Sequence, residues 1–189
     1  SDDDEMIAKL EQAVRRCERK TGPLAELVRM LRGVEGREEE LARARARLLE
    51  SLNEIDAAGH PAVLSEIRRV LSDESVEDRT LELVARTLSR FVEAREDPGA
   101  EVLDLLLSVQ LRLGDTEGAQ ATLNERLPSA DPVQDLDVWL VALDLDVEAE
   151  RWKSALERIG KLPPDVRHSS WVTTLRVRAL GGLGRYDEM

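Results

Sequence analysis

The sequence is poor in several residue types on which particular classes of protein depend. It has one cysteine and two histidines, and aromatic residues are only 3% of its 189 residues. A single cysteine excludes an internal disulfide framework, and one cysteine with two distant histidines cannot complete a tetrahedral zinc site. No apolar run approaches the length needed to cross a bilayer, so we expect no membrane-spanning segment. The sequence also lacks a G-x-S-x-G motif and a glycine-rich phosphate-binding loop.

Positive charge is scarce too, and one stretch has none. The chain has 39 acidic and 27 basic residues, a formal net charge of −12, and no lysine or arginine in residues 127–150. The acidic excess is concentrated in residues 2–5 and in that same stretch. Because an acidic molecule repels phosphate groups, we expect no nucleic-acid partner and no anionic membrane surface, and a basic or apolar protein segment is favoured.

Leucine, in contrast, is abundant, with 30 residues, and alanine, glutamate and arginine are also common. This supply of apolar side chains is enough for a buried core and argues against disorder. Alternation with a period of two, which would indicate strands, is absent. Glycine and proline divide the chain into helix-sized pieces, so we expect an all-α protein. The expected helices span about 3–20, 23–32, 37–57, 61–71, 77–95, 100–113, 116–127, 134–149, 151–161 and 168–183.

The first and third of these helices each carry one apolar stripe at three- and four-residue spacing. Two or three heptads are too few for a coiled coil. We expect the stripes to pack within the chain, with a homodimer seam as the alternative, and we expect Cys17 to be a buried structural thiol. The stripes are Ile7, Leu10, Val14 and Cys17, and Leu41, Ala44, Leu48, Leu52 and Ile55.

The second half of the sequence repeats itself. Three segments that each follow an apolar helix and open another begin at Leu113-Gly114, Ala149-Glu150 and Leu183-Gly184. The equivalent positions Ala119, Ala155 and Met189 are 36 and then 34 residues apart. A period of about 34 residues with two helices per unit resembles the tetratricopeptide repeat.

Individual residues over about 100–189 carry this resemblance. The turn from Leu183 to Glu188 is similar to the inter-helix turn of the family, and Trp139 stands at its tryptophan position. Small and large apolar positions of the family are matched by Ala155 and Ile159, and one unit earlier by Leu103, Leu106, Ala119 and Leu123. The sequence departs from the family where a small residue is usual, at Leu107 and Leu143, and where an aromatic is usual, at Gln110 and Asp146.

The resemblance implies helical hairpins stacked as a right-handed superhelix, an α-solenoid, over residues 100–189. Residues 1–57 are then an N-terminal helical segment that packs on the repeats or dimerises, and 58–99 a divergent helix pair. A plain bundle of helical hairpins is the alternative fold. The last unit stops at Met189, where its second helix should begin, so we expect further repeats after it.

In a solenoid of this kind, the first helix of each unit lines a concave groove. The groove residues combine acids with exposed apolar groups, which suits a basic peptide or amphipathic helix. The family's clamp for chaperone C-terminal carboxylates is not expected, because Asp104 and Leu140 stand at its Lys and Asn positions. The expected protein-binding residues are Glu101, Asp104, Ser108, Arg112, Asp137, Leu140, Val141, Asp144, Glu148, Trp171, Thr174 and Arg178.

These observations favour a non-catalytic scaffold that binds a protein partner, without cofactor or metal, in a bacterial multiprotein assembly in the cytoplasm or at the envelope. The histidines, His60 and His168, are expected at the surface or as helix caps. The main alternative is homo-oligomerisation or membrane-proximal assembly through the N-terminal helices. An enzyme is disfavoured, and a cleft of ionisable groups with displaced pKa values would be its sign.

Overall fold

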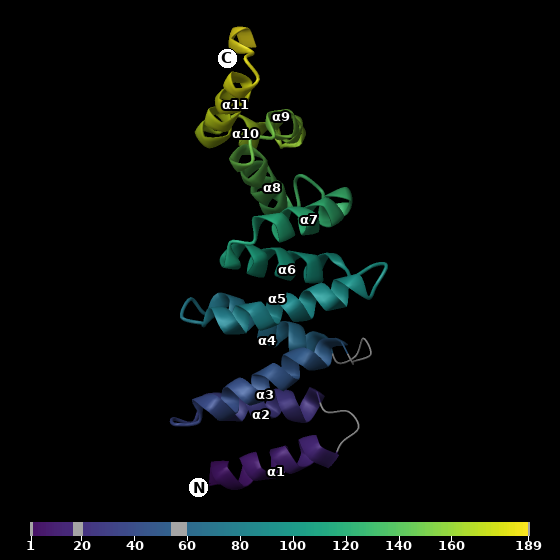
Figure 1. Ribbon diagram of the computed structural model, residues 1–189, viewed down its shortest axis with the longest axis vertical. Coiled ribbons are helices and arrows are strands. Elements are labelled where there is room, and N and C mark those ends of the chain that lie inside the picture. Colours follow the sequence, from purple (N-terminus) through teal and green to yellow (C-terminus); the bar gives the residue numbers. More distant parts are fainter. Residues whose placement is uncertain (1, 17–20, 54–59, 189) are drawn as a thin grey trace. The chain divides into compact units, whose positions relative to one another are not determined.

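The computed structural model describes residues 2–16, 21–53 and 60–188, and every regular element in these ranges is a helix (Figure 1). The expectation of an all-α protein is therefore confirmed. The chain divides into two compact units, Ser1–Gly114 and Asp115–Met189. Each unit has a hydrophobic core of its own, and the division falls at the first of the three repeated turns.

The first unit is a stack of helices (Figure 1). Helices pack on their neighbours in the chain and also on the next helix but one, as α2 does on α4, α3 on α5 and α4 on α6. Alternate helices of this unit therefore lie against one another, as in stacked hairpins. The elements are α1 (Asp2–Arg16), α2 (Thr21–Arg32), α3 (Glu38–Glu50), the 3-10 turn η1 (Ser51–Asn53), α4 (His60–Ser72), α5 (Asp78–Glu93) and α6 (Ala100–Leu113).

The two N-terminal apolar stripes lie in the core of this unit. Ile7 and Val14 of α1 are buried, as are Ala44 and Leu48 of α3 and Leu52 of η1. Burial of each large apolar side chain contributes roughly 1.5–3 kcal/mol, which is ample reason for the stripes to pack inward. The last expected residues of the two stripes, Cys17 and Ile55, lie outside the described residues.

Two helix boundaries of the first unit differ from expectation. The third helix was expected to run on to residue 57, but α3 ends at Glu50 and tightens into η1. There the Ser51 hydroxyl donates to the carbonyl of Leu48 at 2.6 Å, a local bond that competes with the helical pattern. The second helix was expected to begin at Pro23, but α2 begins at Thr21, so the pair Gly22-Pro23 lies inside its first turn. Proline is tolerated there because the first N–H groups of a helix have no partner within it.

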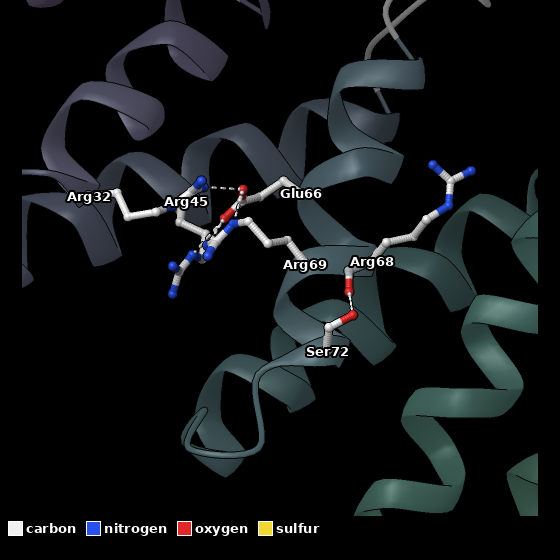
Figure 2. A network of polar contacts seen from close by, with 6 residues as sticks. All are labelled: Arg32, Arg45, Glu66, Arg68, Arg69 and Ser72. Atoms are coloured by element: carbon white, nitrogen blue, oxygen red, sulfur yellow. Dashed lines mark hydrogen bonds and ion pairs between the residues drawn. The ribbon is translucent and has the colours of Figure 1, made fainter.

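A buried carboxylate joins three helices of the first unit (Figure 2). Glu66 of α4 accepts hydrogen bonds from Arg32 of α2 at 2.7 Å, Arg45 of α3 at 2.9 Å and Arg69 of α4 at 2.8 and 3.1 Å. Burial alone raises the pKa of the Glu66 carboxyl, but the hydrogen bonds and charges of these arginines outweigh it and hold the pKa below its usual value. Arg68, on the same helix, points away from this network.

The second unit contains a four-residue helix that the sequence did not lead us to expect, α10, which begins at Pro164. The unit packs α7 on α8, α8 on α9, and α9 on α11 (Figure 1). Its core includes Trp139, Leu143, Ala155 and Ile159. The elements are α7 (Thr116–Arg126), the 3-10 turn η2 (Leu127–Ser129), α8 (Leu136–Glu148), α9 (Trp152–Lys161), α10 (Pro164–Arg167), α11 (Ser170–Gly182) and the 3-10 turn η3 (Tyr186–Glu188).

The three repeated turns share one unusual backbone conformation. Gly114, Glu150 and Gly184, which occupy the same place in the sequence repeat, have φ angles of 70°, 55° and 70°. Glycine adopts this left-handed conformation readily, whereas a residue with a side chain is strained there. Among the described residues Glu150 is the one non-glycine residue with positive φ. The repeat seen in the sequence therefore corresponds to a repeated local geometry.

Candidate interaction surface on the second unit

The acids in the base-free stretch 127–150 fall into two groups, and the first group is buried or paired. Asp146 of α8 has 1% of its side chain exposed. It accepts hydrogen bonds from Arg151 at 2.8 Å, Ser154 at 2.5 Å and Arg158 at 2.6 Å. Burial alone raises the pKa of the Asp146 carboxyl, but the bonds from Ser154, Arg158 and Arg151 outweigh it and keep the pKa low. This carboxylate fixes the end of α8 against α9.

Asp135, just before α8, is also paired. It accepts the backbone N–H of Asp131 at 2.8 Å and a guanidinium N–H of Arg126 at 2.6 Å, and these two bonds lower the pKa of its carboxyl. The Arg126 side chain is 3% exposed, so the pair ties the end of α7 to the start of α8. Both ends of α8 are thus held in place by a carboxylate.

The second group of acids is exposed. Asp137, Asp144 and Glu148 on α8 and Glu150 after it are all at the surface, and within the described part of the chain none of them forms an ion pair or hydrogen bond through its carboxylate. The last turn of α8 contains no basic residue. Negative charge at a helix C-terminus opposes the helix dipole, so this arrangement disfavours the folded state. It would be relieved by a positive group from outside the chain.

Apolar side chains accompany the exposed acids. Leu140 and Val141 of α8 are half-buried, and Trp171 in the first turn of α11 is 44% exposed. Trp139, in contrast, is buried and donates its indole N–H to the carbonyl of Ala130 at 3.3 Å. Trp171 is therefore the tryptophan of this unit that offers a large apolar area to a partner.

The remaining expected binding residues of this unit are already engaged. The Thr174 hydroxyl donates to the carbonyl of Ser170 at 2.9 Å, one helical turn earlier. The Arg178 guanidinium lies over the ring of Trp152, 5.9 Å from its centre.

The four expected binding residues on α6 belong to the first unit. Arg112 donates to the carbonyls of Leu71 at 2.8 Å and Asp73 at 3.2 Å, and so caps the end of α4. Glu101 pairs with Arg68 of α4. The Ser108 hydroxyl donates to the carbonyl of Asp104 at 2.8 Å, and Asp104 itself is half-buried. Two of these four charged or polar groups, Arg112 and Glu101, thus stabilise their own unit.

The sequence reasoning did not find a hollow between α7 and the end of α8. It has a volume of about 530 Å³, within the roughly 300–1,000 Å³ of ligand pockets in proteins. Of the expected binding residues it contains only Glu148. The residues that line it are Thr116, Glu117, Gln120, Leu145, Glu148, Ala149 and Arg151. The sequence signal was Glu150, which stands where the other two repeated turns have glycine and lies between the lining residues Ala149 and Arg151.

The described parts of the chain contain no cluster of metal-ligating side chains and no helix that could span a membrane. In residues 2–16, 21–53 and 60–188, no group of three histidine, cysteine, aspartate or glutamate side chains is arranged to hold a metal ion. No helix in these ranges is long and apolar enough to cross a membrane. His168 is exposed, as expected. His60 begins α4, but its side chain is outside the described part.

Comparison with known proteins identifies no relative. No protein-family profile, no curated protein sequence and no solved structure matches the chain.

Proposed function

We propose that the chain is a non-catalytic helical-repeat scaffold, similar in plan to tetratricopeptide proteins, that binds a basic and apolar protein segment through α8. The observation that carries this proposal is the division of the acids of α8. Asp146 is buried and paired with Arg151 and Arg158, whereas Asp137, Asp144 and Glu148 are exposed on the same helix. The partner we expect is a component of a bacterial assembly in the cytoplasm or at the envelope.

Two observations, one on the backbone and one on side-chain burial, support the repeat architecture in this proposal. The three turns at Gly114, Glu150 and Gly184 share a left-handed residue at equivalent positions. At the positions where two helices of a repeat must cross closely, Ala119 and Ala155 are completely buried. Small side chains there allow the backbones to approach, and the larger neighbours fill the remaining space.

The surface of α8 supports binding of a partner because the apolar and charged contributions lie on one helix. Leu140 and Val141 provide apolar area that is already partly desolvated, and Asp137 and Asp144 flank it in sequence. Charge of one sign accelerates the encounter with a basic segment, and burial of apolar groups then holds it.

A binding measurement with matched charge-reversal variants tests this proposal. The probe is an acetylated and amidated amphipathic peptide of about five helical turns, with leucine on one face and arginine on both borders. We expect the double variant Asp137→Lys, Asp144→Lys to bind it at least about tenfold more weakly in titration calorimetry. The control is Glu157→Lys, Asp165→Lys, which makes the same charge change at exposed acids of α9 and α10.

The two outcomes are distinct. A loss confined to the α8 variant supports binding through α8, whereas an equal loss in both variants indicates attraction by net charge alone and contradicts the proposal. Helicity by far-UV circular dichroism should be unchanged in both, because all four positions are exposed. Trp171→Ala, measured with the same peptide, tests the apolar contribution of α11.

A further inference from the structure

The hollow at the end of α8 combines a helix C-terminus, two carboxylates and an apolar wall. One side of the hollow is formed by Glu117 and Gln120 of α7. The other side is formed by Leu145, Glu148 and Ala149 at the end of α8. Leu145 is 7% exposed, so the wall is well packed. Both glutamates are exposed, and the structure shows no ion pair for either of them within the residues it describes.

The chain itself shows which chemistry this hollow accepts. The guanidinium of Arg151 lies at its wall, where it donates to the side-chain oxygen of Gln120 and to the carbonyl of Leu145 at 3.4 Å. The same guanidinium donates to Asp146 through Nε at 2.8 Å. One positive group from the chain is thus bound there by an amide oxygen, a helix-terminal carbonyl and a carboxylate. Asp146 is shared between this guanidinium and that of Arg158. In the residues that the structure describes, neither Glu117 nor Glu148 forms an ion pair with Arg151.

We propose that this hollow is the anchor site for one arginine side chain of the basic helix that binds α8. The arginine stem lies on Leu145 and Ala149, and its guanidinium donates to Glu117 and Glu148, a planar donor between two carboxylates. The inference rests on the proposed function, because the same partner covers α8, and it adds the position and the residue type of the anchor. The negative end of α8 strengthens the attraction.

The test is a double-mutant cycle between the chain and the peptide described above. In the peptide, each arginine in turn is replaced by citrulline, which keeps the shape of the side chain and removes its charge. In the protein, Glu148→Gln and Glu117→Gln remove the charges of the hollow, and Glu125→Gln, an exposed acid of α7 outside it, is the matched control. We expect each hollow variant to bind about three- to tenfold more weakly and Glu125→Gln to change binding by less than about twofold.

One arginine of the peptide should couple specifically to the hollow. Replacing that arginine with citrulline should weaken binding to the unaltered chain at least about three- to tenfold and should have a smaller effect in Glu148→Gln, where Glu117 alone faces the arginine. If the hollow variants behave like Glu125→Gln while Asp137→Lys, Asp144→Lys still loses binding, the anchor site is refuted and the proposed function stands. If the unaltered chain does not bind the peptide, the proposed function fails, and the anchor site with it.

Discussion

The buried carboxylate of Asp146 offers the sharpest test of how the second unit is held together. We consider Asp146→Asn, which keeps the size of the side chain and one acceptor oxygen but removes the charge. In the native protein this carboxylate forms ion pairs with Arg151 and Arg158, whose side chains are 42% and 15% exposed. The substitution leaves the guanidinium of Arg158 largely buried without its partner.

The magnitude follows from these exposures. Removing one partner of a buried ion pair costs about 3–5 kcal/mol. Arg151 is already partly solvated and keeps its bond to Gln120, so its share of the loss is small. We therefore expect the lower end of that range, about 3 kcal/mol, which corresponds to a fall of about 1–3 M in the urea midpoint at ordinary m-values.

Tryptophan fluorescence is the appropriate assay, because Trp139, Trp152 and Trp171 all belong to the second unit. The fluorescence-detected midpoint should fall in Asp146→Asn. The matched variant Glu66→Gln removes the corresponding carboxylate of the first unit. Because that unit has no tryptophan, its loss of stability should be detected chiefly by far-UV circular dichroism. An unchanged fluorescence midpoint in Asp146→Asn would refute the reasoning that this network stabilises the unit.

The same network predicts a direction for the dependence of stability on pH. The pKa of Asp146 is lower in the folded protein than its usual value. Its stabilising contribution is therefore present above the unfolded pKa of about 3.9 and is lost as the pH falls through the folded pKa. Asp146→Asn should lack this pH-dependent contribution. The difference in the free energy of unfolding between the native protein and the variant should therefore be largest at neutral pH and decrease below about pH 4.

Two predictions concern glycine and the repeated turns. A Cβ atom on Gly182 would lie 2.7 Å from Cδ1 of Trp152 and closer still to two other ring atoms, whereas one on Gly181 meets nothing within 4 Å. Gly182→Ala should therefore lower the free energy of unfolding of the unit by about 1–3 kcal/mol. Gly181→Ala should raise it by up to about 1 kcal/mol. Equal effects of the two substitutions in urea unfolding would contradict the close contact between Gly182 and the Trp152 ring. Glu150→Gly should raise the free energy of unfolding by about 1 kcal/mol, because φ is 55° there, and a thermal melt that shows destabilisation would be evidence against that strain.

The sequence was sufficient for the helices and insufficient for the polar networks. Breakers and apolar spacing located the ten expected helices, because burial of an apolar stripe is a local and strongly periodic signal. The end of α3, seven residues before the expected one, is the largest difference among the described boundaries. The short helix α10, Pro164–Arg167, falls in the gap between the expected helices 151–161 and 168–183, because proline is chiefly a signal for the end of a helix. Proline at the first helical position is nonetheless compatible with a helix, and Arg167 closes this turn with a bond to the carbonyl of Leu162 at 2.8 Å.

The networks were missed because their partners are distant in sequence or have other uses. Arg32 and Arg45 lie 34 and 21 residues from Glu66, and no local pattern connects them. Asp146 was noted only as a departure from an aromatic position of the repeat. Its partners follow within twelve residues, so a buried acid with bases shortly after it was the available signal.

Spacing in the sequence also does not show which charged residues of a helix are available to a partner. Solenoid geometry placed Arg112 and Glu101 in a groove, but both are paired with α4. A charged side chain on a helix can face solvent or pair with a neighbouring helix, and its position in the sequence does not distinguish these two cases. The exposed acids of α8, Asp137, Asp144 and Glu148, are different, because none of them forms an ion pair within the residues that the structure describes.

The contrast between Asp146 and Glu148 connects stability and function in this unit. Both are acids in the last turn of α8, where negative charge is unfavourable. The fold compensates one of them with two arginines and leaves the other at the edge of a hollow, next to a strained Glu150. Under either explanation Glu148→Gln should leave the free energy of unfolding equal or up to about 0.5 kcal/mol higher, because it removes an unfavourable charge. If the charge is merely tolerated, peptide binding should be unchanged. If it is retained for binding, the same substitution should weaken the peptide complex without a loss of stability, so the binding measurement on a variant that stays folded separates the explanations.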